Sequence, residues 1–253
     1  MVLGFIPAAF GIIFTVALAV GAVAARALTP VAGVVAAAFG IVIVVFAGFP
    51  FLALMILFVV GSVLATRFRI DEKRSKNVQE GTAGERGVSN VVAHIVLPTG
   101  LAIAGGWAPP LIPVAALTVL FASALAFGAA DTFASELGVL VGRARSILTF
   151  RAVPPGTNGG VSGVGELWAL VGAGVTAIVG LALYGLSSTA VPAAGVFLGT
   201  VVIAGFVGCQ VDSVLGESLE NRGWLNKGST NFLGMLSAVA IAAAILAGLG
   251  VAL

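Results

Sequence analysis

The stretch "LIPVAALTVLFASALAFGAAD", residues 111–131, decides the fold. Its residues 111–130 carry no charge, and about 20 apolar residues suffice for a helix to cross the hydrocarbon core of a bilayer. The run ends on Asp131, and a carboxylate at the end of a membrane span is costly unless it has a partner there. The stretch therefore predicts a membrane-spanning helix that brings an acidic side chain to one membrane face.

The composition extends this prediction to the whole chain. Of its 253 residues 60% are hydrophobic and only 9% are charged, whereas a soluble domain carries about 25% charged residues. The mean hydropathy is +1.18. One cysteine excludes an intrachain disulfide and a cysteine-based metal site. We therefore expect an all-α integral membrane protein, with the lipid bilayer as its surroundings and no nucleic-acid partner.

Apolar runs of spanning length predict a polytopic bundle of about eight transmembrane helices in a single transmembrane domain, residues 1–253. These runs lie near residues 5–25, 31–48, 51–66, 90–106, 111–130, 166–186, 191–213 and 230–252. All 12 Lys and Arg residues fall in the connections between spans 1 and 2, 3 and 4, 5 and 6, and 7 and 8. The positive-inside rule makes this face cytoplasmic. Both termini are then expected on the non-cytoplasmic side, with polar active-site loops on the cytoplasmic face.

Three polar segments gather on the predicted cytoplasmic face: residues 67–94, 128–166 and 205–232. The second segment holds Asp131 and Glu136, followed by the uncharged loop "VPPGTNGGVS", residues 153–162. In the third, Asp212 shares a helix face with glycines, which leave room for a ligand to approach closely. The sequence thus predicts two acids, Asp131 and Asp212, at the ends of two helices beside a glycine-rich loop.

These residue types suit phosphate chemistry. Carboxylates favour Mg²⁺, which takes few protein ligands and keeps water and substrate phosphates. A glycine-rich loop can direct backbone N–H groups at phosphate oxygens. The loop is not a Walker A motif, because no Gly-Lys-Ser/Thr follows it. The candidate nucleotide-binding residues are Pro155, Gly156, Thr157, Asn158, Gly159, Gly160 and Ser162, and the candidate ligands of a substrate phosphate are Arg69, Lys73, Arg86, Asn90, Arg151, Lys227 and Asn231.

Four blocks resemble the membrane phytyl-phosphate (prenyl-phosphate) kinase family: "DTFASELG", "RAVPPGTNGGVS", "VDSVLGESLE" and "NKGSTNFLG". The resemblance covers roughly residues 67–235 and extends more remotely to phytol and dolichol kinases and to phosphatidate cytidylyltransferases. It implies CTP-dependent phosphorylation of an isoprenoid monophosphate, such as phytyl or geranylgeranyl phosphate, to the diphosphate. The chain departs from the family at "NVVAH", residues 90–94, which leaves the preferred substrate open.

The favoured hypothesis is a kinase in which Mg²⁺ and the triphosphate of CTP meet at Asp131 and Asp212, with Glu136 as a further catalytic or metal-binding residue. The expected partners are a prenyl-phosphate lipid and a nucleoside triphosphate, and a homo-oligomer stays open. The same parts could instead perform cytidylyl transfer and make a CDP-lipid. Glycine- and proline-interrupted segments with acids are also typical of transporters, so transport of a small solute or ion is a third alternative.

Overall fold

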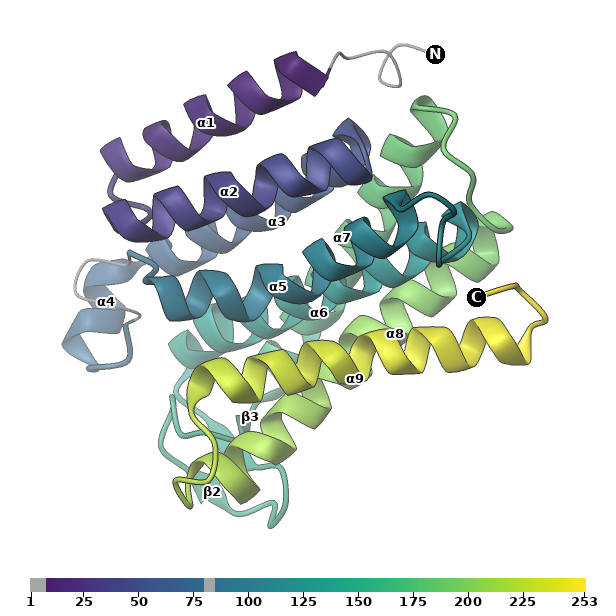
Figure 1. The fold of residues 1–253 in the computed structure, drawn as a ribbon. Helices are drawn as coiled ribbons and strands as arrows, with labels where there is room; N and C mark the ends of the chain where they lie inside the picture. The colour runs from purple at the N-terminus through teal and green to yellow at the C-terminus, as the bar shows by residue number, and fades with distance from the viewer. Residues whose placement is uncertain (1–7, 80–84) are drawn as a thin grey trace.

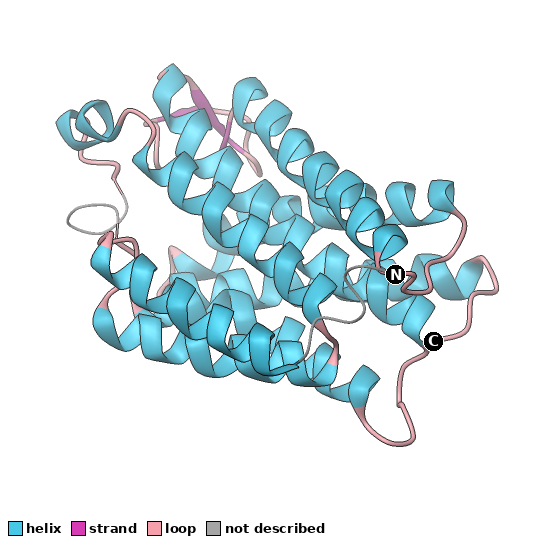
Figure 2. Cartoon of the chain, turned by 90° about the horizontal axis from the view of Figure 1, so that it is seen from above, coloured by secondary structure: helices cyan, strands magenta, loops and turns pink. Residues whose placement is uncertain are grey.

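A computed structural model describes residues 8–79 and 85–253, and it confirms an all-helical membrane architecture (Figures 1 and 2). Within these described residues, six helices are long and apolar enough to cross a membrane: α3 (Phe49–Arg67), α5 (Val88–Gly106), α6 (Val114–Gly138), α7 (Gly163–Leu186), α8 (Ala194–Leu215) and α9 (Lys227–Gly248). Two apolar helices are shorter, with 17 residues each in the structure: α1 (Ala8–Ala24) and α2 (Pro30–Phe46). These correspond to the eight predicted runs, although residues 5–7 of the first run lie outside the described residues.

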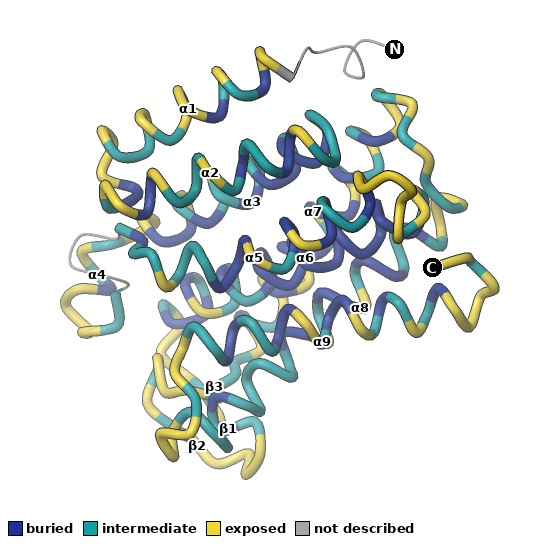
Figure 3. Tube along the Cα trace, viewed as in Figure 1, coloured by how far each residue is buried: buried dark blue, intermediate teal, exposed yellow. Residues whose placement is uncertain are grey.

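Helix α6, formed by the stretch that begins at residue 111, is the centre of the bundle. Every residue from Ala116 to Ala130 is buried, and α6 packs against α3, α5, α7, α8 and α9. Its most apolar part is 83% buried, against 50% or less in the other five long helices. Figure 3 shows this buried helix surrounded by partly exposed ones. The middle of α6 therefore faces protein, and its neighbours face lipid.

Small residues let two neighbouring helices approach α6 closely. A Cβ at Gly172 of α7 would lie 2.7 Å from the backbone of Ala129, and one at Gly205 of α8 would lie 2.7 Å from the Cβ of Ala126. Such contacts between small residues bring helix backbones together in membranes, where the hydrophobic effect does not drive association. The close packing fixes the ends of α6, α7 and α8 relative to one another.

Two helices extend beyond the ends of their predicted apolar runs. Helix α6 continues to Gly138 and then into a 3-10 turn, Val139–Val141, whereas the predicted span ended at residue 130. Helix α8 continues into a π turn, η2, over Gly216–Glu220. Polar residues can extend a helix beyond the apolar run because only length within the hydrocarbon is limited by the bilayer. Asp131 consequently lies within α6, and Asp212 lies in the last turn of α8, directly before the π turn.

A small antiparallel sheet follows α6 and was not predicted. Its strands are β1 (Ala144–Ser146), β2 (Ala152–Val153) and β3 (Gly160–Val161), in the order β2-β1-β3. Strands of two or three residues give almost no periodic signal, which is why the sequence pattern did not indicate them. The sheet holds the glycine-rich loop between β2 and the start of α7.

The polar connections gather at one end of the bundle. Figure 1 shows the sheet, the start of α9 and the short helix α4 (Ile70–Ser75) at this end, and the C-terminus at the opposite end. Because successive membrane helices run in opposite directions, every second connection lies at the same end of the bundle. The connections that contain the Lys and Arg residues therefore lie at the end with the sheet (Figure 1). The assignment of this end to the cytoplasm stays a prediction of the positive-inside rule.

Candidate functional site

A cavity of about 210 Å³ lies where α6, α8, the glycine-rich loop and the starts of α7 and α9 meet. It brings together residues that are far apart in sequence and that were predicted to act together. These residues are Asp131, Glu136, Pro155, Gly156, Thr157, Asn158, Gly159, Gly160, Ser162, Asp212, Lys227 and Asn231. Other polar residues line the same cavity and were not predicted as site residues: Ser135, Arg143, Glu166, Ser213 and Glu220.

The glycine-rich loop is folded by its own backbone. The N–H of Gly160 donates to the carbonyl of Thr157 at 2.8 Å, and the Thr157 hydroxyl donates to the carbonyl of Pro154 at 2.8 Å. Gly159 has a φ of 74°, and a Cβ there would lie 2.4 Å from the Cβ of Glu217. Both observations require glycine at this position, because other residues rarely adopt positive φ and the space is filled. The loop is therefore a rigid wall of the cavity.

The π turn after α8 ties the sheet and the loop in place. Glu217 accepts hydrogen bonds from the Ser146 hydroxyl at 2.5 Å and from the Leu148 N–H at 3.3 Å. Glu220 accepts one from the side chain of Asn158 at 3.0 Å. Single π turns in α-helices occur frequently at functional sites. Ser146 had no signal in the sequence, and Glu217 lay in the block "VDSVLGESLE" without an assigned role, because the contact arises only when β1 and the π turn meet.

Two helix N-termini lie at the cavity. Ser162 caps α7, its hydroxyl oxygen accepting from the Gly165 N–H at 3.0 Å. Helix α9 begins at Lys227 after a capping box formed by Asn226 and Ser229. Helix N-termini carry a partial positive charge and unpaired N–H groups, and both features favour phosphate. The cavity therefore offers positive helix ends on one part of its wall.

Carboxylates from three helices line another part of the wall. Asp131 comes from α6, Asp212 from α8, and Glu166 from the first turn of α7, where it accepts a hydrogen bond from Gln210 at 2.8 Å. The Asp212 Oδ1 is buried, and no donor among the described residues reaches it. A buried carboxylate oxygen without a donor has a high desolvation cost, which a cation would remove.

The carboxylates at the cavity suit one kind of metal ion better than another. Within residues 8–79 and 85–253, no group of three or more His, Cys, Asp or Glu side chains forms a complete metal-binding cluster. Zinc sites use three or four such protein ligands. Mg²⁺ needs fewer protein ligands, because one or two carboxylates with water and substrate phosphates complete its coordination shell. The donor set of Asp131 and Asp212 fits a magnesium ion that arrives with a phosphate ligand.

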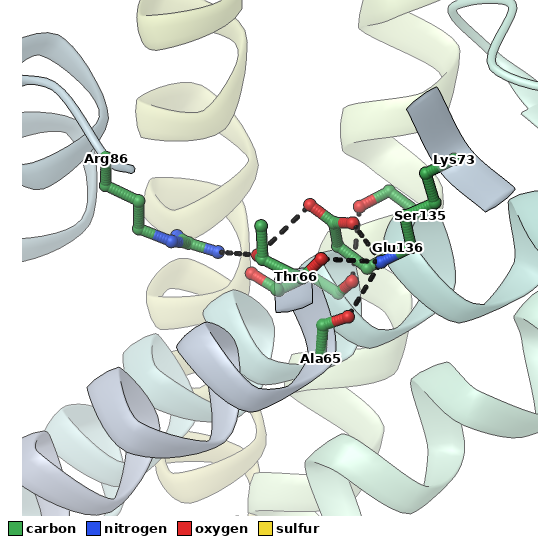
Figure 4. Close-up of polar contacts among 7 residues, drawn as sticks. Ala65, Thr66, Lys73, Arg86, Ser135 and Glu136 are labelled. Atoms are coloured by element: carbon green, nitrogen blue, oxygen red, sulfur yellow. Dashed lines mark hydrogen bonds and ion pairs between the residues drawn. The ribbon is translucent and has the colours of Figure 1, made fainter. Parts of the chain in front are cut away.

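Glu136 lies at the edge of the cavity, but both of its oxygens are used within the protein. Lys73 Nζ lies 2.6 Å from Glu136 Oε2, and the Thr66 hydroxyl donates to Oε1 at 3.1 Å. Lys73 also donates to the carbonyls of Ala65 and Thr66 at 2.7 and 3.0 Å. Figure 4 shows these contacts around the buried ammonium group. The structure thus places Glu136 and Lys73 in an ion pair rather than facing a ligand.

The structure separates the remaining predicted phosphate ligands from the cavity. Arg86 and Asn90 line a smaller cavity of about 50 Å³ near His94, where Arg86 donates to Asn90 Oδ1 at 2.9 Å. Arg69 is exposed and pairs with Glu72, whose pKa is lowered mainly by a hydrogen bond from Lys76. Arg151 is exposed in the turn between β1 and β2. Of the predicted phosphate ligands, Lys227 and Asn231 are the ones brought to the main cavity.

The fold and the cavity define a polytopic membrane protein with a polar site at one end of its helices. The chain belongs to the family described as integral membrane protein DUF92, whose profile matches residues 13–239. This match includes the glycine-rich loop, both aspartates and the π turn.

Relatives of the chain are found in archaea, cyanobacteria and plants. An uncharacterized membrane protein of Methanocaldococcus jannaschii is 30% identical over 173 residues, 66% of this chain and 64% of that protein. One of Synechocystis is 31% identical over 186 residues, 70% of this chain and 68% of that protein. Protein PGR of Arabidopsis thaliana is 41% identical over 101 residues, 37% of this chain and 34% of PGR. The chain thus matches about two thirds of the length of the first two relatives. No solved structure matches the chain.

Proposed function

We propose that the chain is a phosphotransferase that moves the γ-phosphate of a nucleoside triphosphate onto a membrane isoprenoid monophosphate, in the presence of Mg²⁺. One observation carries this proposal: a single cavity joins the glycine-rich loop, Asp131, Asp212 and the N-termini of α7 and α9. Phosphoryl transfer is catalysed mainly by positioning and by stabilisation of charge. The walls of this cavity offer both.

The glycine-rich loop and the start of α7 would hold the triphosphate. Gly156 and Gly159 have positive φ, at 82° and 74°, and a Cβ there would lie 2.9 Å from Val78 and 2.4 Å from Glu217, so glycine is what lets the loop take this shape. Among the described residues, no acceptor is bonded to the N–H groups of Asn158 and Gly159. These N–H groups, with those at the N-terminus of α7, are suited to donate to phosphate oxygens.

Asp131 and Asp212 would hold the magnesium ion, and the chemistry that it would supply there is neutralisation of phosphate charge. The lipid phosphate would lie near Lys227 and Asn231, at the start of α9. A phosphate monoester is anionic near neutral pH, so its oxygen can attack the γ-phosphate without a strong general base. Glu136 is assigned to holding Lys73 and not to the reaction, because its oxygens accept bonds within the protein.

The identity of the substrates follows from the resemblance and from the location of the site. The four blocks that resemble prenyl-phosphate kinases lie at this cavity, and they favour CTP as the donor and a phytyl or geranylgeranyl phosphate as the acceptor. The membrane helices beside the cavity would hold the prenyl chain in lipid. The positive-inside rule places the reaction at the cytoplasmic face, where soluble nucleotides are available.

The aspartates provide the test. Asp131→Asn and Asp212→Asn should each abolish transfer of γ-phosphate to prenyl monophosphate, while the proteins still insert into membranes and unfold at the wild-type temperature. Asp71→Asn is the matched control, because the Asp71 side chain is 92% exposed on α4. Near-normal transfer by either cavity variant would refute the assignment of metal binding to that residue.

A further inference from the structure

Two turns at the sheet end of the bundle expose large apolar side chains. Phe150 is 70% exposed and Leu148 is 48% exposed in the turn between β1 and β2, and Trp224 is 73% exposed between the π turn and α9. These side chains lie outside the apolar spans that face lipid tails. A single exposed apolar residue needs no explanation, but a group of three at adjoining turns indicates a contact surface.

Both turns are attached to the same π turn. The Leu148 N–H donates to Glu217 Oε2 at 3.3 Å, and the Trp224 N–H donates to the carbonyl of Leu219 at 3.1 Å. Figure 1 shows the sheet beside the end of α8, at the edge of the bundle. The two turns therefore lie together at the border between the helices and their surroundings.

The turn that carries Phe150 has a defined shape. Phe150 has a φ of 57°, which is uncommon for a large side chain. Its N–H donates to the carbonyl of Ser146 at 2.9 Å, and its carbonyl accepts from Arg145 Nη1 at 3.0 Å. These contacts hold the backbone while the aromatic ring stays exposed. The ring is therefore presented outward by an ordered turn.

The charge around these apolar side chains is positive. Arg145, Arg151 and Arg222 are all exposed, and the guanidinium of Arg222 lies 5.9 Å from the centre of the Trp224 ring. The neighbouring acids Glu217 and Glu220 accept hydrogen bonds from the sheet and from the loop. Positive charge complements the phosphates of anionic lipids, and aromatic rings are enriched at the membrane interface.

We propose that residues 145–151 and 222–224 form a membrane-surface contact that binds anionic lipid head groups. Phe150, Leu148 and Trp224 enter the interfacial layer, and the three arginines contact lipid phosphates. Because β1 pairs with β3 next to the glycine-rich loop, this contact holds the cavity at the height of the lipid head groups. The proposal concerns the bilayer and does not depend on the reaction at the cavity.

Tryptophan fluorescence tests the contact directly. Trp107→Phe and Trp168→Phe leave Trp224 as the single tryptophan among the three in the chain. The protein is reconstituted in nanodiscs of phosphatidylcholine alone or mixed with phosphatidylglycerol, with or without lipids brominated near the head group. We expect a blue-shifted Trp224 emission that brominated lipids quench, more strongly with phosphatidylglycerol and less strongly at high salt.

Variants with altered charge distinguish binding to anionic head groups from mere closeness of Trp224 to the bilayer. Arg151→Gln, which leaves the Arg145 contact to the turn in place, should reduce the dependence on phosphatidylglycerol, while Arg74→Gln, an exposed arginine of α4, should leave it unchanged. If the double tryptophan variant folds poorly, the Trp224 emission is obtained instead as the difference between the emission of wild type and that of Trp224→Phe, with the other tryptophans kept. Water-like Trp224 emission that is equal in both lipids and insensitive to brominated lipid would overturn the proposal.

Discussion

Lys73 Nζ lies 2.6 Å from Glu136 Oε2, and the two residues are 63 positions apart in the sequence. The lysine side chain is fully buried and the glutamate side chain is 9% exposed. The pair connects the short helix α4 to the end of α6, one turn after Asp131. It therefore fixes α4 against the helix that carries a predicted metal ligand.

Lys73→Met should destabilise the protein strongly. Removing one partner of a buried pair leaves the other charge uncompensated, which costs about 3–5 kcal/mol. Arg74→Met is the control, because the Arg74–Asp71 pair is exposed and such pairs contribute about 0–1 kcal/mol. The free energy of unfolding of both variants is measured in detergent micelles, with circular dichroism as the signal.

The double variant Lys73→Met/Glu136→Leu should recover part of this loss, because it leaves no buried charge. A double variant as unstable as the sum of both single variants would show that the two residues act independently. Activity that falls in Glu136→Gln without any change in stability would instead support a direct role of Glu136 in the reaction.

Gly159→Val should prevent nucleotide binding. The substitution places a side chain at positive φ and against Glu217, and strain of this kind costs about 1–3 kcal/mol before any clash. Gly174→Ala in α7 is the control, since nothing lies within 4 Å of a Cβ there. Equilibrium binding of CTP checks the prediction, and wild-type affinity in Gly159→Val would refute a role of the loop in nucleotide binding.

Glu217→Ala should raise the KM for the nucleotide by about tenfold with a smaller effect on kcat, since a hydrogen bond to a charged group contributes about 1.5–3 kcal/mol. Glu217 positions the loop through Ser146 and Leu148, so Ser146→Ala should act in the same direction. Glu217→Gln keeps an acceptor and should restore part of the affinity. Ser218→Ala, on the same π turn, serves as the control, and equal loss of kcat and affinity in all variants would indicate a general structural defect.

The sequence was sufficient for the membrane helices and for part of the cavity wall, but not for Arg143, Glu166 and Glu220, which also line it. The bilayer sets the length of an uncharged apolar span, so such spans can be predicted from composition alone. Asp131, Asp212 and the glycine-rich loop could be identified because they are polar or glycine-rich and lie beside long apolar runs. The Lys73–Glu136 pair and the Ser146–Glu217 contact could not be predicted, because each depends on which helix ends meet in space. Lys73 consequently looked like a phosphate ligand, although the fold surrounds it with acceptors.

The measurement that tests the central claim most directly is the fate of the nucleotide phosphates. Purified protein in nanodiscs is incubated with Mg²⁺, phytyl or geranylgeranyl monophosphate, and CTP labelled at the α- or the γ-phosphate, with ATP, GTP and UTP compared in parallel. We predict that the γ-label appears in prenyl diphosphate, with one CDP released per product, and that Asp212→Asn shows no transfer. Release of pyrophosphate with the α-label in a CDP-lipid, or transfer of neither label from any nucleotide, would contradict the account.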